Sequence, residues 1–194
     1  MDVRRLILDH AVEAVAEHGV RGVSFRDVAR RAGVSHQAPY HHFGSLRGIM
    51  EEVAREGFSS LSASMRKAAS NKEDPLDALH AIGLAYVRFA IKNVGHFRVM
   101  FQQALVDIHD LEIESAIETY TVLEEVAERV SDANGPSFLD AETLAHLCWS
   151  TVHGLATLLV EQCLQKKSQR EMNAEIRSVL EGLTQLLKHS ADRR

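Results

Sequence analysis

The chain has 194 residues, of which 45% are hydrophobic and 25% charged, and this ordinary globular composition excludes a disordered or fibrous protein. Only three prolines interrupt it, which favours helices over short strands joined by proline-rich turns. The two cysteines, Cys148 and Cys163, are too few for a disulfide framework, so we expect both to be reduced thiols in the core.

Charge is unevenly distributed along the chain. The net charge is −5, but residues 1–50 hold seven Lys and Arg against five Asp and Glu, so this segment carries +2 and the remainder −7. A basic head on an acidic body favours contact between the head and phosphates. The chain opens without an apolar signal segment, and no run approaches membrane-spanning length, which predicts a cytoplasmic protein without a membrane partner.

A first amphipathic helix is expected over residues 3–18. Ile7, Ala11 and Val15 recur at intervals of four residues and therefore share one face. Gly19 follows directly and is a typical helix stop.

Two shorter helices follow the first. Ser24 is placed to cap the earlier one, with Asp27 in its first turn, and Gly33 ends it. Ser35 is placed to cap the later one, which extends through His42. Two short helices joined by a glycine-containing turn describe a helix-turn-helix.

The remainder of the chain also shows helical periodicity. A boundary near residue 50 divides the whole chain into an expected DNA-binding domain, 1–50, and a larger helical domain, 51–194. No persuasive strand is present, so the fold class is all-α. The further helices are expected at 45–69, 75–93, 96–104, 110–130, 140–165 and 171–189.

The order of motifs in the first quarter of the chain is similar to that of a known family. Ile-Leu-Asp-His-Ala at 7–11, Phe-Arg-Asp-Val-Ala at 25–29 and the segment 33–43 together resemble the TetR/AcrR family of bacterial repressors. The resemblance implies a three-helix helix-turn-helix domain followed by a helical bundle that binds an effector and dimerises.

The resemblance also implies which residues contact DNA. His36, Gln37 and Ala38 fall where the family's recognition helix meets bases; Gln37 suits adenine and the Ala38 methyl suits thymine. Arg26, on the preceding helix, matches a position that reaches guanine. The full set of expected DNA contacts is Ser24, Arg26, Ser35, His36, Gln37, Ala38, Tyr40, His41, His42 and Arg47.

Within this set, Ser24, Tyr40 and His42 match positions that contact phosphates. Many family members carry a lysine where this chain has Leu46, and Arg47 is the neighbouring residue that can replace that contact.

Two other interpretations of these side chains remain open. Tyr40 and Phe43 could be aromatic residues of the core. Arg26, Arg30 and Arg31 could form a solvated charged face without a binding role.

The larger domain contains bulky side chains with a few polar tips, as small-molecule sites commonly do. Ordinary core packing is the alternative for each of them. The expected effector contacts are Tyr86, Phe89, Phe97, Met100, Phe101, Ile117, Tyr120, Trp149 and His153, with Ile113 as a further candidate.

Trp149, His153 and Gly154 resemble the WHG motif of one C-terminal domain class in the family. Trp149 and His153 are four residues apart and share a helix face, while Gly154 would allow another helix to approach closely. The alternative is a packing joint with a hydrogen-bonded core histidine.

Two apolar stripes near the end of the chain are candidates for a dimer interface built from two helices of each subunit. The family pattern implies this arrangement, whereas periodicity alone would equally allow a core within one chain. The expected interface residues are Leu155, Leu158, Leu159, Ile176, Val179, Leu180, Leu183 and Leu187.

Enzyme chemistry is not expected. There is no nucleophile motif, phosphate loop or dinucleotide fingerprint. His146 and His153 are separated by roughly 10.5 Å along a helix, too far for one metal ion, and His36, His41 and His42 do not converge. We therefore expect no metal and no cofactor.

The predicted function is a ligand-responsive transcriptional repressor. It would bind a palindromic operator in double-stranded DNA as a homodimer and be released by a small, largely apolar effector. The alternatives are a ligand-independent DNA-binding regulator and, more remotely, a helical enzyme.

Overall fold

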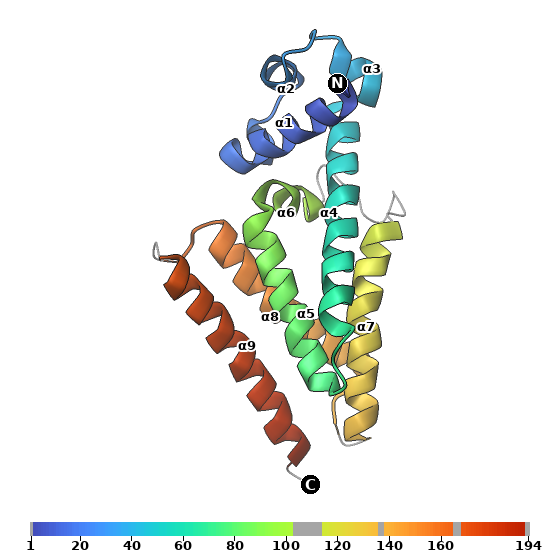
Figure 1. Cartoon of the computed structure of the whole chain (residues 1–194), viewed down its shortest axis with the longest axis vertical. Coiled ribbons are helices and arrows are strands. Elements are labelled where there is room, and N and C mark those ends of the chain that lie inside the picture. Colours follow the sequence, from blue (N-terminus) through green and yellow to red (C-terminus); the bar gives the residue numbers. More distant parts are fainter. Residues whose placement is uncertain (1, 103–113, 136–137, 165–167, 193–194) are drawn as a thin grey trace. The chain divides into compact units, whose positions relative to one another are not determined.

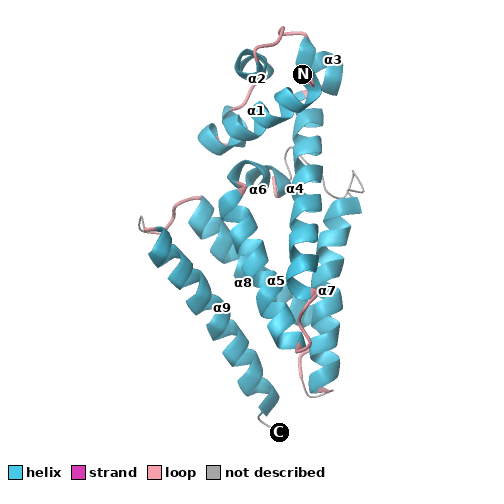
Figure 2. Cartoon of the chain, viewed as in Figure 1, coloured by secondary structure: helices cyan, strands magenta, loops and turns pink. Residues whose placement is uncertain are grey.

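A computed structural model describes residues 2–102, 114–135, 138–164 and 168–192 (Figure 1). Helices joined by turns account for this part of the chain, with no strand in it (Figure 2), which confirms the all-α fold class. The chain divides into two compact units. The first unit is Met1–Ser60 with Asn93–Ile117, and the second unit is Leu61–Lys92 with Glu118–Arg194.

The first unit contains the predicted helix-turn-helix and a short helix from later in the chain. It also contains the beginnings of two helices, α4 and α7, that continue into the second unit. Its elements are α1 (Val3–His18), the 3-10 turn η1 (Val20–Gly22), α2 (Phe25–Ala32), α3 (Ala38–Phe43), the first part of α4 (Leu46–Ala69) and α6 (Val94–Met100).

Helix α1 has the bounds that its periodicity predicts. Asp2 caps it by accepting hydrogen bonds from the Arg4 and Arg5 amides, and Gly19 ends it with φ at +70°. The face predicted to be apolar is fully buried, since Ile7, Ala11 and Val15 are inaccessible to solvent. Burial of this stripe, rather than helix propensity, supplies most of the stability of such a helix.

The second unit is a bundle in which α5 packs on both α8 and α9 (Figure 1). At Gly83 on α5, an added Cβ would lie 3.3 Å from side-chain atoms of Leu180 and of Val152, so the small residue permits close packing. Its helices are the end of α4, α5 (Pro75–Lys92), most of α7 (Glu114–Asn134), α8 (Ala141–Val160) and α9 (Gln169–Asp192).

Helix α8 is long and strongly apolar. Among the described residues it is the one helix long and apolar enough to cross a membrane by those criteria, with a mean hydropathy of 1.3. The sequence expectation that no run has this length is therefore wrong. A core helix of a globular protein satisfies the same criteria, so length and composition alone do not make α8 a membrane span.

The two cysteines differ in environment. Cys148 is buried in α8, as expected, and burial raises the pKa of its thiol to about 12. Cys163 is exposed in the turn beyond α8, so the expectation that it lies in the core is wrong. The helix predicted to reach residue 165 ends at Val160, and Gln162 in the following turn has a φ of +53°.

Candidate nucleic-acid interface and effector site

Ser24 fixes the start of α2, as predicted. Its hydroxyl oxygen accepts a hydrogen bond from the Asp27 amide at 3.2 Å, which satisfies one of the unpaired donors of the first turn. Gly33 ends the helix in the left-handed conformation, with φ at +65°. These local signals hold α2 to eight residues.

The start of α3 differs from the prediction. The helix begins at Ala38, its N-cap residue is Gln37, and no side chain caps it. Ser35 instead accepts a hydrogen bond through its carbonyl oxygen from the Ala38 amide, at 3.0 Å. The expected Ser35 cap is thus wrong, because His36 and Gln37 form a turn that separates Ser35 from the helix.

Tyr40 is an exposed aromatic residue rather than a member of the core. Its ring stacks on Phe25 of α2, with centroids 4.2 Å apart and planes inclined by 15°, yet 55% of the residue remains accessible. The stack supports one face of the ring and restricts its rotamers. Phe43, at the end of α3, is partly buried, and the Arg4 guanidinium lies 5.2 Å from its ring centroid.

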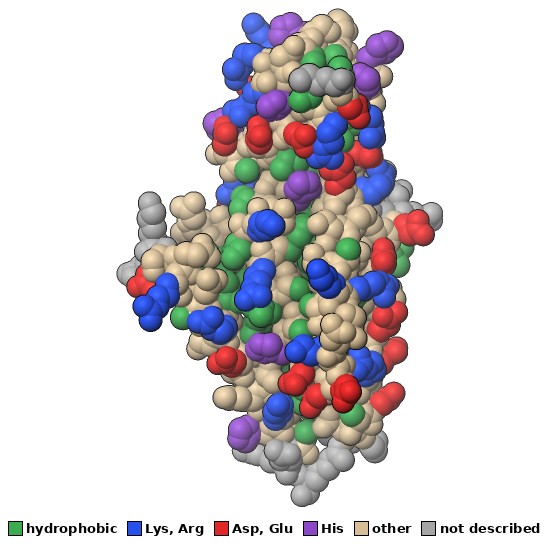
Figure 3. All heavy atoms as spheres, viewed as in Figure 1, with side chains coloured by type: hydrophobic (Ala, Val, Ile, Leu, Met, Phe, Trp, Pro, Cys, Tyr) green, Lys and Arg blue, Asp and Glu red, His purple; other side chains and the backbone are tan. Residues whose placement is uncertain are grey.

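The other expected DNA contacts are also at the surface of the first unit. Figure 3 shows histidine and basic side chains gathered over α1 to α3. Ala38 is partly buried. The exposed members are Ser24, Arg26, Ser35, His36, Gln37, Tyr40, His41, His42 and Arg47.

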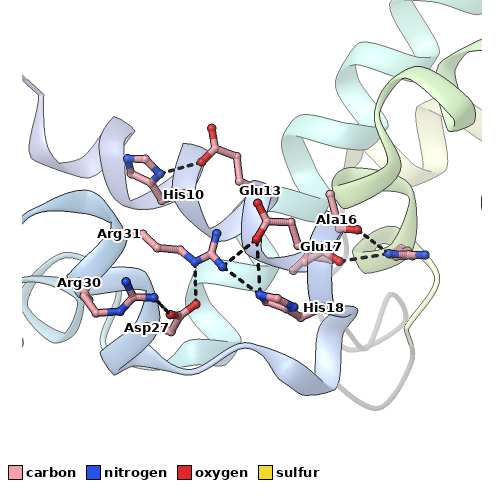
Figure 4. Close-up of polar contacts among 10 residues, drawn as sticks. His10, Glu13, Ala16, Glu17, His18, Asp27, Arg30 and Arg31 are labelled. Atoms are coloured by element: carbon pink, nitrogen blue, oxygen red, sulfur yellow. Dashed lines mark hydrogen bonds and ion pairs between the residues drawn. The ribbon is translucent and has the colours of Figure 1, made fainter.

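The arginines of α2 have different electrostatic partners (Figure 4). Asp27 pairs with Arg30 at 2.5 Å and with Arg31 at 2.8 Å, and these two guanidinium groups hold the pKa of Asp27 below its ordinary value. Arg31 also pairs with Glu17 of α1 at 2.8 Å, which ties α2 to α1. Arg26 takes part in no ion pair with the described residues.

Helix α6 contacts the C-terminal half of α1, a contact that sequence reasoning missed. Arg98 donates hydrogen bonds to the carbonyl oxygens of Val15 and Ala16 at 3.3 and 2.8 Å. At Gly95, an added Cβ would lie 2.3 Å from the Val12 carbonyl oxygen, so only glycine allows this approach. Arg98 is 82 and 83 positions away from its two partners in the sequence, so no local pattern indicates the pairing.

The expected effector contacts fall into both compact units, and Ile113 lies outside the described residues. In the first unit, Phe97 and Phe101 pack with ring centroids 5.4 Å apart, and Met100 is fully buried. Ile117 is 61% exposed on α7. The second unit holds Tyr86, Phe89, Tyr120, Trp149 and His153.

Three polar aromatic residues of the second unit form a connected cluster. The Tyr86 hydroxyl lies 2.8 Å from Nδ1 of His153, and the Trp149 ring centroid is 6.2 Å from that of His153. Burial raises the pKa of Tyr86, and a hydrogen bond with Trp149 opposes this shift. Burial also lowers the pKa of His153, which favours its neutral form.

Gly154 does not perform the packing role expected of it within one protomer. It is exposed, and an added Cβ would meet no atom within 4 Å. The expected close approach of a second helix is therefore not made by any of the residues that the structure describes.

The expected dimer residues divide into buried and accessible members. Leu155, Ile176, Leu180 and Leu187 are already buried within the protomer, which favours the alternative of an intrachain core for these four. The accessible members are Leu158, Leu159, Val179 and Leu183. Leu147 and Leu186, outside the expected set, are exposed as well.

Comparisons with known proteins agree with this architecture. Residues 7–53 match the family described as "Bacterial regulatory proteins, tetR family", and residues 79–187, more than half of the chain, match "Tetracyclin repressor-like, C-terminal domain". The chain is 25% identical to the uncharacterized HTH-type transcriptional regulator YobS of Bacillus subtilis, over 93% of this chain and 92% of that protein. It is 32% identical to the HTH-type transcriptional repressor KstR2 of Mycobacterium tuberculosis over about half of each chain.

Solved structures show the same fold. A protein with unknown function from Rhodococcus sp. RHA1 is 25% identical, with a TM-score of 0.77 over 96% of this chain and 94% of that one. PfmR of Thermus thermophilus, a TetR family transcriptional regulator, is 24% identical, with a TM-score of 0.72 over 91% and 98% of the two chains. Together with the exposed helix-turn-helix, these matches establish that the chain belongs to the TetR family and is a DNA-binding transcriptional regulator, not an enzyme.

Proposed function

We propose that this regulator is a cytoplasmic repressor that binds a palindromic operator as a homodimer and leaves it when an effector binds the second unit. The observation that carries the proposal is the exposed end of α3, where Gln37 and His36 precede a helix whose Tyr40 is supported by Phe25. A short helix presented in this way fits the major groove, with its N-terminal residues nearest the base edges.

The contacts divide into base-reading and phosphate-positioning groups. Gln37 would read a base, and Arg26, which is exposed and forms no ion pair with described residues, would reach a guanine from α2. Tyr40 and His42 would hold the phosphate backbone. Ser24 lies at the N-terminus of α2, where the helix dipole favours an anion.

Dimerisation would use the apolar surface that α8 and α9 leave uncovered. Leu147 and Leu158 on α8 and Leu186 on α9 are the most exposed leucines there, and exposed Gly154 lies between the first two on the same helix face. A Cβ added at Gly154 would meet no described atom of the protomer within 4 Å, so a partner helix could approach closely at this position. Burying these groups removes apolar surface from water.

The effector would contact the cluster of Tyr86, Trp149 and His153. Large apolar rings joined by a few polar atoms are suited to a small organic molecule, and two members of the cluster, Trp149 and His153, belong to the segment that resembles the WHG motif. An effector releases DNA only if it binds the released conformation more tightly. A regulator that acts without an effector is the alternative.

Selection from a pool of random duplex DNA tests the DNA-binding half of the proposal. We expect enriched sequences to contain two inverted half-sites, and the affinity for them to fall steeply with salt because phosphate contacts release counterions. Enrichment of a single unpaired half-site would contradict dimeric recognition. A small-molecule screen for release of the selected duplex then separates the effector-controlled repressor from the ligand-independent alternative.

A further inference from the structure

Helices α7 and α8 bring three aromatic rings and two carboxylates to the same pair of helix faces. On α8, Glu142, His146 and Trp149 are separated by four and three residues and therefore share a face. On α7, Tyr120 and Glu124 are four residues apart. The Tyr120 ring centroid lies 6.2 Å from that of His146 and 5.7 Å from that of Trp149, so the two faces meet. We call these five residues the α7–α8 seam.

The seam is accessible to solvent. His146 is exposed, and Tyr120, Glu124 and Trp149 are partly exposed, whereas Tyr86 is buried. The ring of His153 lies 6.2 Å from both Trp149 and Tyr86. A molecule bound at the seam would therefore be next to the polar aromatic cluster described above.

The electrostatic environment of the seam is negative. After burial, the charges of Glu124 and Glu142 are the further causes that raise the pKa of Tyr120. Neither carboxylate takes part in an ion pair with the described residues, whereas Glu118 and Glu125 on the same α7 both pair with Arg66. Figure 3 shows acidic side chains gathered along the α7 edge.

Aromatic faces and carboxylates favour the same kind of ligand. The face of a tyrosine or tryptophan ring is electron-rich and attracts a cation, most strongly when the cation is weakly hydrated, as a quaternary ammonium is. The two carboxylates add long-range attraction for positive charge and repel anions. A purely apolar ligand would gain nothing from them.

We propose that the α7–α8 seam binds the positively charged group of an organic cation, a quaternary ammonium or a protonated amine carried on an apolar body. This proposal rests on the effector-binding function proposed above and gives the charge of the effector. The rings of Tyr120 and Trp149 contact the cationic group, and Glu124 and Glu142 supply the neutralising charge.

Trp149 is the chain's only tryptophan, so its fluorescence reports directly on the seam. The three probes have nearly the same shape: benzyltrimethylammonium, its neutral carbon isostere neopentylbenzene, and the anion phenylmethanesulfonate. Titrated into the intact protein, the cation should change Trp149 emission with a Kd at least about tenfold below that of either other probe. Equal affinity for the neutral isostere, tighter binding of the anion, or no binding of the cation would each overturn the proposal.

Variants then test the individual groups. Tyr120→Phe should keep the affinity for the cation because the ring remains, and Tyr120→Leu should lose it. Glu124→Gln and Glu142→Gln should each weaken cation binding without changing the response to the neutral probe. Glu181→Gln makes the same charge change at an exposed site on α9 and should have no effect. Unchanged cation affinity in both seam glutamine variants would overturn the proposal.

The experiment separates this inference from the proposed function. If the anion or the neutral probe binds and releases the selected duplex, effector control stands and the cationic assignment fails. If the cation binds at Trp149 but leaves the duplex bound, the seam is a cation site and its role as the effector site fails.

Discussion

The Arg98 guanidinium of α6 lies 2.8 Å from the carbonyl oxygen of Ala16, near the last residue of α1. Terminal carbonyl groups of a helix have no partner within the helix, and the helix dipole makes that end negative. Arg98, which is part-buried, therefore donates a hydrogen bond to a terminal carbonyl oxygen of α1 and places a positive charge at the negative end of its dipole.

Replacing Arg98 should weaken the first unit. Arg98→Met keeps much of the side-chain volume but removes the donor to the Ala16 carbonyl oxygen, while Val15 keeps its hydrogen bond from the Gly19 amide, so we expect a loss of about 1–2 kcal/mol in the free energy of unfolding. Urea denaturation followed by circular dichroism measures this loss. Arg98→Lys, which retains a donor and the charge, should recover part of it. An unchanged unfolding midpoint in Arg98→Met would show that solvent satisfies the Ala16 carbonyl equally well.

Removing the Tyr40 hydroxyl should weaken binding to all operators by a similar factor. Tyr40→Phe keeps the stack on Phe25 and therefore the fold of the helix-turn-helix. It loses a phosphate hydrogen bond worth about 0.5–1.5 kcal/mol. Fluorescence anisotropy on the selected duplex and on single-position variants of it measures the effect. A loss confined to certain base sequences would show that Tyr40 reads bases instead.

Gln37→Ala should alter specificity more than stability. Gln37 is exposed and its side chain caps no helix, so the free energy of unfolding should change by less than about 0.5 kcal/mol. A bidentate contact with adenine is worth about 1–3 kcal/mol of discrimination, and this should disappear at one position in each half-site. Repeating the selection with the variant tests the assignment, which an unchanged preference at every position would contradict.

Two adjacent leucines of α9 should respond differently to a charge. Leu186 is 70% exposed, so Leu186→Lys should leave the protomer folded and convert dimers into monomers, as measured by sedimentation velocity. Leu187 is buried, so Leu187→Lys should instead destabilise the protomer itself, by about 3 kcal/mol or more. A Leu186→Lys protein that remains dimeric would place the interface elsewhere.

Acidification should destabilise the second unit through His153. Burial lowers the pKa of His153 in the folded protein, so the unfolded chain binds more protons as the pH falls below about 6.5. The free energy of unfolding should therefore decrease between pH 7.5 and 5.5. His153→Gln cannot bind this proton, so its stability should decrease less over the same range in urea titrations. His96, whose pKa burial also lowers, gives His96→Gln as a comparison in the first unit. Parallel decreases in the wild type and in His153→Gln would show that other groups control the pH dependence.

Local features of this protein were readable from its sequence because they depend on near neighbours. The bounds of α1, the Ser24 cap and the Gly33 stop follow from spacing and from single residues with special backbone preferences. The ordered motifs of the first quarter identified the helix-turn-helix in the same way. The predicted start of α3 was nevertheless wrong. Ser35 begins a turn and does not cap the helix, and serine is common both in turns and at helix N-caps.

Tertiary structure alone decided which side of each later helix is inside. Leucines on α8 and α9 recur with a helical period. This periodicity indicates that each helix has an apolar face, but it does not indicate which part of the protein covers that face. Helices α8 and α9 both pack on α5, and in the folded protomer Leu155 and Leu180 are buried whereas Leu158 and Leu186 are exposed. The Arg98 contact with α1 likewise joins residues more than eighty positions apart, and such a pairing depends on how the helices pack rather than on any neighbouring residue.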